Sequence, residues 1–177
     1  MQRAIRRGTI SAMVAAAFVA IAIPWLTPVA FASPAPGWHV GQTGTITETV
    51  GDARKPVSAA WAATVRCPDC GTSAPPNKTL KVLPRHGVIV TANIRPTGQE
   101  MWPPDGRRVA SNYSVTSAYR FACCEAESSG GISEMYGFGP QRAYTVLVRV
   151  YWGSPPDKTM RLAAQRAIRT LHLPQAH

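Results

Sequence analysis

The chain has 177 residues, with 19 basic and 9 acidic side chains and a formal net charge of +10 at pH 7. This length allows one domain, or at most two small ones, and excludes a larger multidomain architecture. The basic balance favours loose attraction to acidic polymers and headgroups, but it does not define a binding site.

The first 32 residues contain the three parts of a secretory signal peptide. Residues 1–7 (MQRAIRR) are basic, 10–23 (ISAMVAAAFVAIAI) are apolar, and Ala30-Phe31-Ala32 is a small-x-small cleavage signal before Ser33. The stretch up to Ala32 is also long enough to remain as an uncleaved signal anchor. Both alternatives export everything after Ser33, either as a secreted protein or on the extracytoplasmic face of the membrane.

The 145 residues after Ala32 are enough to bury the core of a single domain. Without the three arginines of the signal segment, the exported part keeps 16 basic and 9 acidic residues, a net charge of about +7. We expect a flexible Pro/Gly-rich lead-in at 33–44 and one domain over 45–173.

The first half of this domain is predicted to consist of strands between turns. A strand is expected at 45–50, a turn at 51–56, a second strand at Trp61–Arg66 and a loop at 67–79. The clearest strand is 87–94, where every second residue is apolar and shares one face of a half-buried strand.

The second half contains the most regular strand of the chain. After a turn-rich loop at 95–108, β character resumes at 112–124, and 132–139 is predicted as a short polar hairpin arm. The strand at 144–152 alternates without exception, and its core-facing residues are Tyr144, Val146, Val148, Val150 and Trp152.

An amphipathic helix is expected between Asp157, a good N-cap, and Pro174, which cannot continue a helix. Its apolar arc is narrow and rich in alanine, so that the helix can lie close on a sheet. The members of this arc are Met160, Ala163, Ala164, Ala167, Ile168 and Leu171. The predicted fold class is α+β: a mainly antiparallel sheet of about five strands with one C-terminal amphipathic α-helix packed on it, preceded by an N-terminal hydrophobic signal helix.

Four cysteines, Cys67, Cys70, Cys123 and Cys124, are predicted to form two disulfides, because the chain is exported and their number is even. A vicinal Cys123–Cys124 bond requires a distorted peptide, whereas a Cys67–Cys70 bond is geometrically easy. We favour crossed links between the two motifs, since each closes a long loop and contributes about 4 kcal/mol in the entropy model. A Cys₄ metal site and a thiol redox centre are the alternatives.

Candidate catalytic groups are few. The candidate carboxylates gather near a predicted turn: Glu125, Glu127 and Glu134. Two of them could act as a pair in glycosidase-type hydrolysis. The alternative is that all three are solvated acids at the tip of a hairpin. No nucleophile, base and orienting group can be named together, and the four histidines have no useful spacing. We expect no cofactor and no bound metal. Five aromatic residues either line a pocket or fill the core: Trp61, Trp102, Tyr136, Phe138 and Trp152.

The outer arc of the predicted helix carries Lys158, Arg161, Arg166 and Arg169. Such a stripe either contacts phosphates of an anionic wall polymer or of lipid headgroups, or is a solvated polar face. No aromatic residue interleaves with it, which argues against specific nucleic-acid binding. The chain is otherwise expected at the membrane only if the signal segment stays uncleaved.

Two stretches also carry a joint pattern. In 57–94 an Ala-Trp-Ala run precedes a cysteine-containing loop and a T-L-x-x-L-P-x-x-G-[IV]-x-[IV] strand entry, and 143–174 contains a [VF]-[YWF]-[FW]-G-x-P strand end and a final helix. Together they resemble exported and membrane-anchored actinobacterial proteins of unknown function. The resemblance implies export, one α+β domain and a GC-rich Gram-positive source, but no activity and no site. The Cys123-Cys124 pair departs from this pattern.

The function expected from these observations is that of an exported cell-envelope protein, a non-catalytic binding or interaction domain stapled by disulfides. One alternative is a small extracytoplasmic hydrolase or ligand-binding enzyme that uses the region of Glu125, Glu127 and Glu134. The other is a metal or thiol redox protein that uses the four cysteines.

Overall fold

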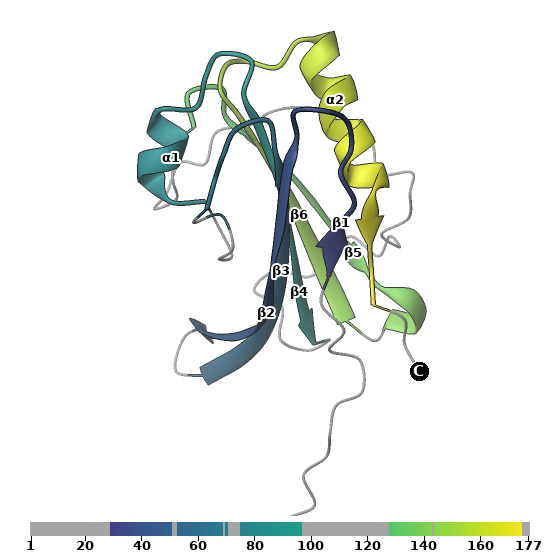
Figure 1. Ribbon diagram of the computed structural model, residues 1–177. Coiled ribbons are helices and arrows are strands. Elements are labelled where there is room, and N and C mark those ends of the chain that lie inside the picture. The colour runs from purple at the N-terminus through teal and green to yellow at the C-terminus, as the bar shows by residue number, and fades with distance from the viewer. Residues whose placement is uncertain are drawn as a thin grey trace, which may run out of the picture.

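The computed structural model of the protein describes residues 29–50, 53–68, 70, 75–96, 128–142 and 144–174. Within these ranges the fold is α+β, with antiparallel sheets and an α-helix near the C-terminus (Figure 1). This confirms the expected fold class in these terms. The expected signal helix and the expected strand at 112–124 lie outside the described residues.

Antiparallel pairing joins all strands of the described ranges. One sheet has five strands in the order β2-β3-β4-β6-β5, and β1 pairs with β7 in a separate two-stranded sheet. A 3₁₀ turn precedes β6. The elements are β1 (Ala30–Phe31), β2 (His39–Val50), β3 (Ala53–Ala63), α1 (Asn77–Lys81), β4 (Val88–Pro96), β5 (Ile132–Phe138), the 3₁₀ turn (Pro140–Arg142), β6 (Tyr144–Trp152), α2 (Lys158–Arg169) and β7 (Leu171–His172).

β6 lies between β4 and β5, and its side chains alternate between two environments. The five residues on one face, at every second position from Tyr144 to Trp152, are at most 1% exposed and join the core that α2 covers. On the opposite face Leu147 and Arg149 are half-buried. The expected core face of this strand is therefore confirmed, whereas the opposite face is also largely covered, because Thr145 and Tyr151 on it are buried.

Polar atoms on the core face of β6 have partners. The indole N–H of Trp152 donates a hydrogen bond to Ser133 Oγ on β5 at 3.0 Å. The buried phenol of Tyr144 donates to the carbonyl oxygen of Pro174 at 2.6 Å, and burial raises the pKa of Tyr144 to about 12. This bond holds the chain after β7 against the beginning of β6.

α2 begins as the sequence predicts. The carboxylate of Asp157 accepts a hydrogen bond from the backbone N–H of Met160 at 2.8 Å, the usual N-cap contact. The helix buries Met160, Ala164, Ala167 and Ile168, and the small alanines let it lie close to β4. It ends earlier than expected, at Arg169, because the chain turns at Thr170 and continues as β7 before it reaches Pro174.

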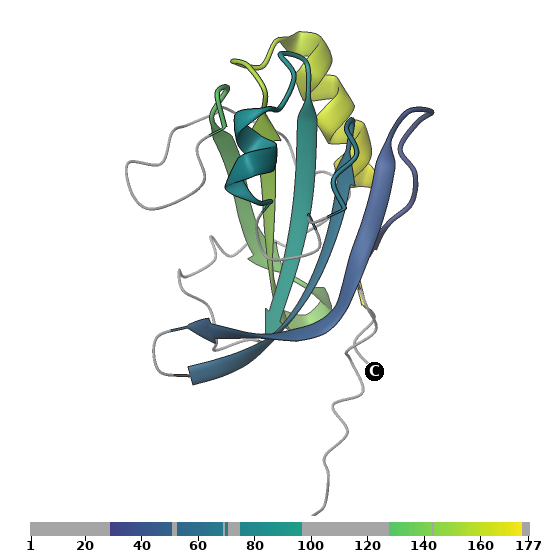
Figure 2. The same cartoon turned by 60° about the vertical axis from the view of Figure 1, so that its left-hand side comes forward.

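The β2–β3 hairpin is longer than the sequence suggests. β2 begins at His39, inside the expected flexible lead-in, and β3 begins at Ala53, inside the expected turn, so both expectations are wrong. Val50 pairs with Ala53, which leaves two residues for the turn. β4 pairs with β3 only from Ser58 onward, and the tip of the hairpin therefore projects beyond the sheet (Figures 1 and 2). Strand partners, which local patterns do not reveal, extend both strands.

Two short elements were not expected at all. α1 begins inside the loop predicted at 67–79 and ends just after it, and it is held by Leu80, which is 0% exposed. β1 lies inside the expected signal peptide and pairs with β7, far along the chain (Figure 1). Both elements are too short for a periodic pattern, so only tertiary contacts define them.

Replacement of Asp157 by alanine is expected to lower the free energy of unfolding by about 1 kcal/mol, because the N–H of Met160 loses its acceptor. Urea denaturation of the protein measures this loss. Asp157→Ser is the matched control, since serine also caps helices, and it should retain most of the stability. Equal losses in both variants would show that the cap contributes nothing.

Candidate functional site

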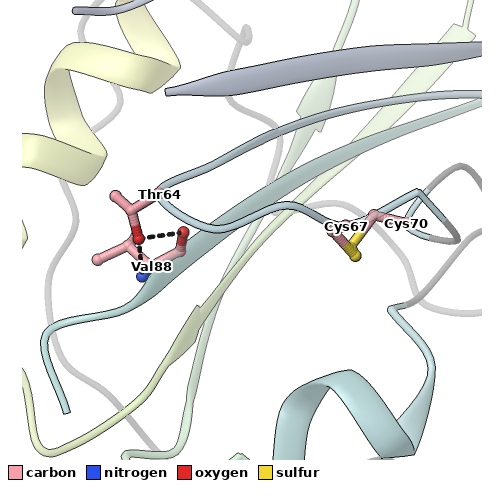
Figure 3. The surroundings of a disulfide bond; sticks show 4 residues. All are labelled: Thr64, Cys67, Cys70 and Val88. Atoms are coloured by element: carbon pink, nitrogen blue, oxygen red, sulfur yellow. Dashed lines mark hydrogen bonds between the residues drawn. A yellow bond between two sulfur atoms is a disulfide. The ribbon is translucent and has the colours of Figure 1, made fainter. Parts of the chain in front are cut away.

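The first candidate site is the cysteine loop that follows β3. Cys67 and Cys70 form a disulfide with a Cα–Cα distance of 5.3 Å (Figure 3). The backbone N–H of Cys70 also donates to the carbonyl oxygen of Cys67 at 3.1 Å, so a tight turn brings the two side chains together. Just before the loop, Thr64 is fixed to the start of β4: its Oγ1 accepts from the backbone N–H of Val88 at 2.9 Å.

The crossed links favoured from the sequence are wrong for these two cysteines, because Cys67 and Cys70 bond to each other. The entropy model favours a long-range link, but it takes no account of the turn that already closes the short ring. Cys123 and Cys124 lie outside the described residues. Of the predicted disulfide bonding, the structure confirms one bond, between Cys67 and Cys70.

The disulfide belongs to a second apolar cluster on the sheet face that points away from α2. Both cysteines are 1% exposed. Since the two sulfurs are bonded and buried, neither is a thiolate ligand nor an accessible redox group in this state. The disulfide therefore acts as a staple that fixes the loop on the sheet. The cluster consists of Trp61, Ala63, Cys67, Cys70, Leu80, Leu83, Ile89, Ile132 and Tyr151, with Val65 packed against it.

The second candidate site is an ion pair on the same face of the sheet. Arg149 on β6 and Glu134 on β5 are direct cross-strand partners, and Arg149 Nε lies 2.5 Å from Glu134 Oε1. Their side chains are 12% and 4% exposed. Tyr136 donates its phenol hydrogen to Glu134 Oε2 at 2.8 Å. Burial, together with this carboxylate, raises the pKa of Tyr136 above its ordinary value and keeps the phenol protonated.

This ion pair ends a continuous row across the sheet. Gly41, Trp61, Thr91, Arg149 and Glu134 are successive register partners on β2, β3, β4, β6 and β5. Gly41 leaves room for the indole, because a Cβ at this position would lie 2.6 Å from ring atoms of Trp61. Thr91 is 1% exposed. The row contains the aromatic ring of Trp61 and the Arg149–Glu134 ion pair. Glu134 is its only carboxylate, so the row does not provide the paired carboxylates of a glycosidase.

The third candidate site is the outer face of α2. Lys158, Arg166 and Arg169 are exposed, and none of them is within ion-pair distance of a carboxylate in the described part of the chain. Arg161 is half-buried and donates from Nε to the carbonyl oxygen of Pro156 at 3.3 Å. Leu162 lies among these cations and is 49% exposed. We call these residues, Lys158, Arg161, Leu162, Arg166 and Arg169, the outer face of α2.

The structure does not assemble the other predicted sites. Among the three candidate carboxylates, Glu134 is held by Arg149, while Glu125 and Glu127 lie outside the described residues. The five aromatic residues do not line one pocket, because Trp152 belongs to the α2-facing core and Trp61 to the opposite cluster. Phe138 stacks with the guanidinium of Arg142, 4.6 Å from its ring centroid, and Trp102 lies outside the described residues.

Arg149 is the residue that sequence reasoning missed. It interrupts an apolar strand, and this is a visible signal, but its partner on β5 follows only from the strand register. In the described ranges, no three His, Cys, Asp or Glu side chains come together as metal ligands. The helices of these ranges are also too short or too polar to cross a membrane.

No protein-family model, no curated protein and no solved structure matches this chain. The resemblance to exported actinobacterial proteins therefore stays a prediction.

Simultaneous replacement of Cys67 and Cys70 by alanine is expected to lower the free energy of unfolding by about 2 kcal/mol, the entropy-model value for a ring of four residues. Long-range links would give about 4 kcal/mol. Urea denaturation measures the difference. Peptide mapping without reductant should show both cysteines in one closed peptide, and should do so equally in a Cys123→Ala/Cys124→Ala control. A peptide that joins the two motifs would refute the pairing.

Glu134→Gln is expected to destabilise the protein by about 3 kcal/mol, because the shape is kept while the charge of Arg149 loses its buried partner. Arg149→Met should cost a similar amount. The double variant should be more stable than the sum of the two losses predicts, and a double-mutant cycle from urea denaturation gives this coupling energy. Simple additivity would show that the pair does not interact.

Proposed function

We propose that the protein is an exported, non-catalytic binding domain that docks on an anionic membrane surface through the outer face of α2. The observation that carries this proposal is an exposed row of cations with no carboxylate paired to Lys158, Arg166 and Arg169 in the described residues. Export itself is supported by the signal-like segment at 1–32.

The distribution of acidic groups supports this choice of surface. Two acidic side chains are described, and both have structural roles. Glu134 is buried against Arg149, and Asp157 caps α2. Glu134 therefore does not offset the positive charge of the outer face of α2, whereas Asp157, next to Lys158, offsets one charge at the start of the helix. A surface with unbalanced cations attracts polyanions over roughly a Debye length, about 8–10 Å at physiological salt.

Helix stability accounts for only part of the charge pattern. Arg166 and Arg169 lie in the last turn of α2, where cations interact favourably with the helix dipole. Lys158 lies in the first turn, where a cation interacts unfavourably with the same dipole. Because Lys158 is exposed and works against the helix, an interaction with a partner explains it better than folding does.

Leu162 decides between the two anionic partners expected from the sequence. It is one turn after Lys158 and one turn before Arg166, and it is about half exposed, at 49%. A wall polymer would gain little from an apolar side chain. A lipid surface accepts the leucine between its headgroups while the cations bind phosphates, as amphipathic interfacial helices do. We therefore favour anionic lipid over wall polymer.

No observation favours a catalytic function to the same degree. The only described candidate carboxylate, Glu134, is neutralised by Arg149 and also accepts from Tyr136. Such a group is not available as a nucleophile or as a general base. The thiol chemistry proposed for Cys67 and Cys70 would first require reduction of their disulfide.

Charge reversal of Lys158, Arg166 and Arg169 to glutamate is expected to weaken binding of the exported protein to phosphatidylglycerol vesicles by about 100-fold or more, at about 1 kcal/mol for each cation lost. Vesicle co-sedimentation at several salt concentrations measures the affinity. Reversal of Arg66, Lys81 and Arg85, which are exposed elsewhere, is the matched control and should have a much smaller effect. Equal effects of the two triple variants would refute a specific surface.

The same experiment separates lipid from polymer. Leu162→Ser should reduce binding to phosphatidylglycerol vesicles about tenfold, because the buried methyl and methylene groups are lost. It should leave binding to a soluble poly(glycerol phosphate) unchanged. If Leu162→Ser has no effect on vesicles, the partner is a polyanion without an apolar phase, and the lipid proposal is wrong.

A further inference from the structure

The residues immediately before the expected cleavage point are part of the folded core. Val29 is 0% exposed and Phe31 is 6% exposed, and both belong to the cluster formed by α2 and the core face of β6. Cleavage after Ala32 would remove both side chains. The core would then lack two apolar groups that the rest of the described chain packs against.

Backbone contacts hold the same segment in place. Ala30 and Phe31 pair with His172 and Leu171 in the β1–β7 sheet. The N–H of Ala32 donates to the carbonyl oxygen of Thr170 at 3.1 Å. The hydroxyl of Thr170 donates back to the carbonyl oxygen of Ala32 at 2.8 Å. The segment therefore pairs with β7 through its backbone and fills part of the core with the side chains of Val29 and Phe31.

The segment also bridges the two sheets. β1 contacts β2 and β3, and the N–H of Val29 lies 3.4 Å from Ser58 Oγ on β3. Ser58 is itself 2% exposed. Without β1, the described chain provides no other strand to pair with β7. Loss of the segment would expose the end of α2 and one side of β3 to water together.

We propose that the mature protein retains Val29–Ala32, and that Ala30-Phe31-Ala32 is a core strand rather than a cleavage site. Signal cleavage precedes folding, so that a chain cut after Ala32 would never possess this strand. Two routes keep it. The apolar segment stays uncut as an anchor, or cleavage follows the earlier small-x-small sequence Ala20-Ile21-Ala22.

Retention also determines where a tether would join the domain. Since Ala30 pairs with His172 and Phe31 with Leu171, the chain enters β1 at the far end of β7, and Ala32 then lies beside Thr170 at the C-terminal end of α2 (Figure 1). This is the end that carries Arg166 and Arg169. The inference goes beyond the proposed lipid docking and needs only export.

The N-terminus of the exported protein tests the proposal directly. Intact mass and N-terminal sequencing of protein recovered from outside the cytoplasmic membrane should place the first residue at or before Val29. The uncut chain and a chain that begins at Ile23 both support the proposal. A mature chain that begins at Ser33 overturns it.

Point variants give a second test that does not depend on recovery of the N-terminal peptide. Phe31→Ala keeps the small-x-small pattern and should lower the Tm of the exported protein by about 5–10 °C. Val40→Ala, at a 40% exposed position of β2, is the matched control and should change the Tm by less than about 2 °C. An unchanged Tm in Phe31→Ala would show that Phe31 is absent from the mature protein.

A third variant examines the cleavage signal itself. Ala32 is exposed, so Ala32→Arg should leave the fold intact while it destroys a small-x-small site at this position. We expect the same mature mass, apart from the substitution, and the same yield of exported protein. Accumulation of a longer precursor would overturn the proposal. Vesicle binding is measured separately, so that failure of retention and failure of lipid docking are distinguished.

Discussion

The fold depends on the packing of α2 against the core face of β6 and β4. Five alternate residues of β6, from Tyr144 to Trp152, are completely or almost completely buried there. α2 meets them with alanines at 164 and 167, which allow close approach, and with Met160 and Ile168 as larger contacts. Because β6 is paired on both sides, this one contact also places β4 and β5. The remaining elements are arranged around it.

The opposite face of the sheet is organised by different forces. A cluster covers part of this face, and in it α1 and the Cys67–Cys70 loop pack on Trp61 and Ile89. The same face carries the Arg149–Glu134 pair, to which Tyr136 adds a hydrogen bond. A buried ion pair contributes little net stability, whereas loss of one partner is costly because it leaves a buried charge unpaired. This arrangement explains why a glutamate near a turn serves the structure rather than chemistry.

The charge of the protein becomes informative only when the acids are located. A net charge of +10 by itself indicates loose attraction to polyanions. The two described acidic side chains are used for the ion pair and the helix cap. Among the described residues, Lys158, Arg166 and Arg169 have no carboxylate partner, and they lie next to a half-exposed leucine. This combination, rather than the net charge, motivates the proposed lipid contact.

Local sequence patterns determined much of the fold of this protein: the alternation of 88–94 and 144–152, the cap at Asp157, the apolar arc of α2 and, from these, the α+β class. Each of these is a contact between residues near in sequence or a period that one element carries alone. The tertiary structure alone decided the extent of the β2–β3 hairpin, the pairing of Glu134 with Arg149, the closure of Cys67 on Cys70 and the role of 29–32 as a core strand. The register of a strand and the burial of a two-residue segment depend on partners far along the chain, and an Ala-Phe-Ala sequence has the same local chemistry whether it is a cleavage signal or an edge strand.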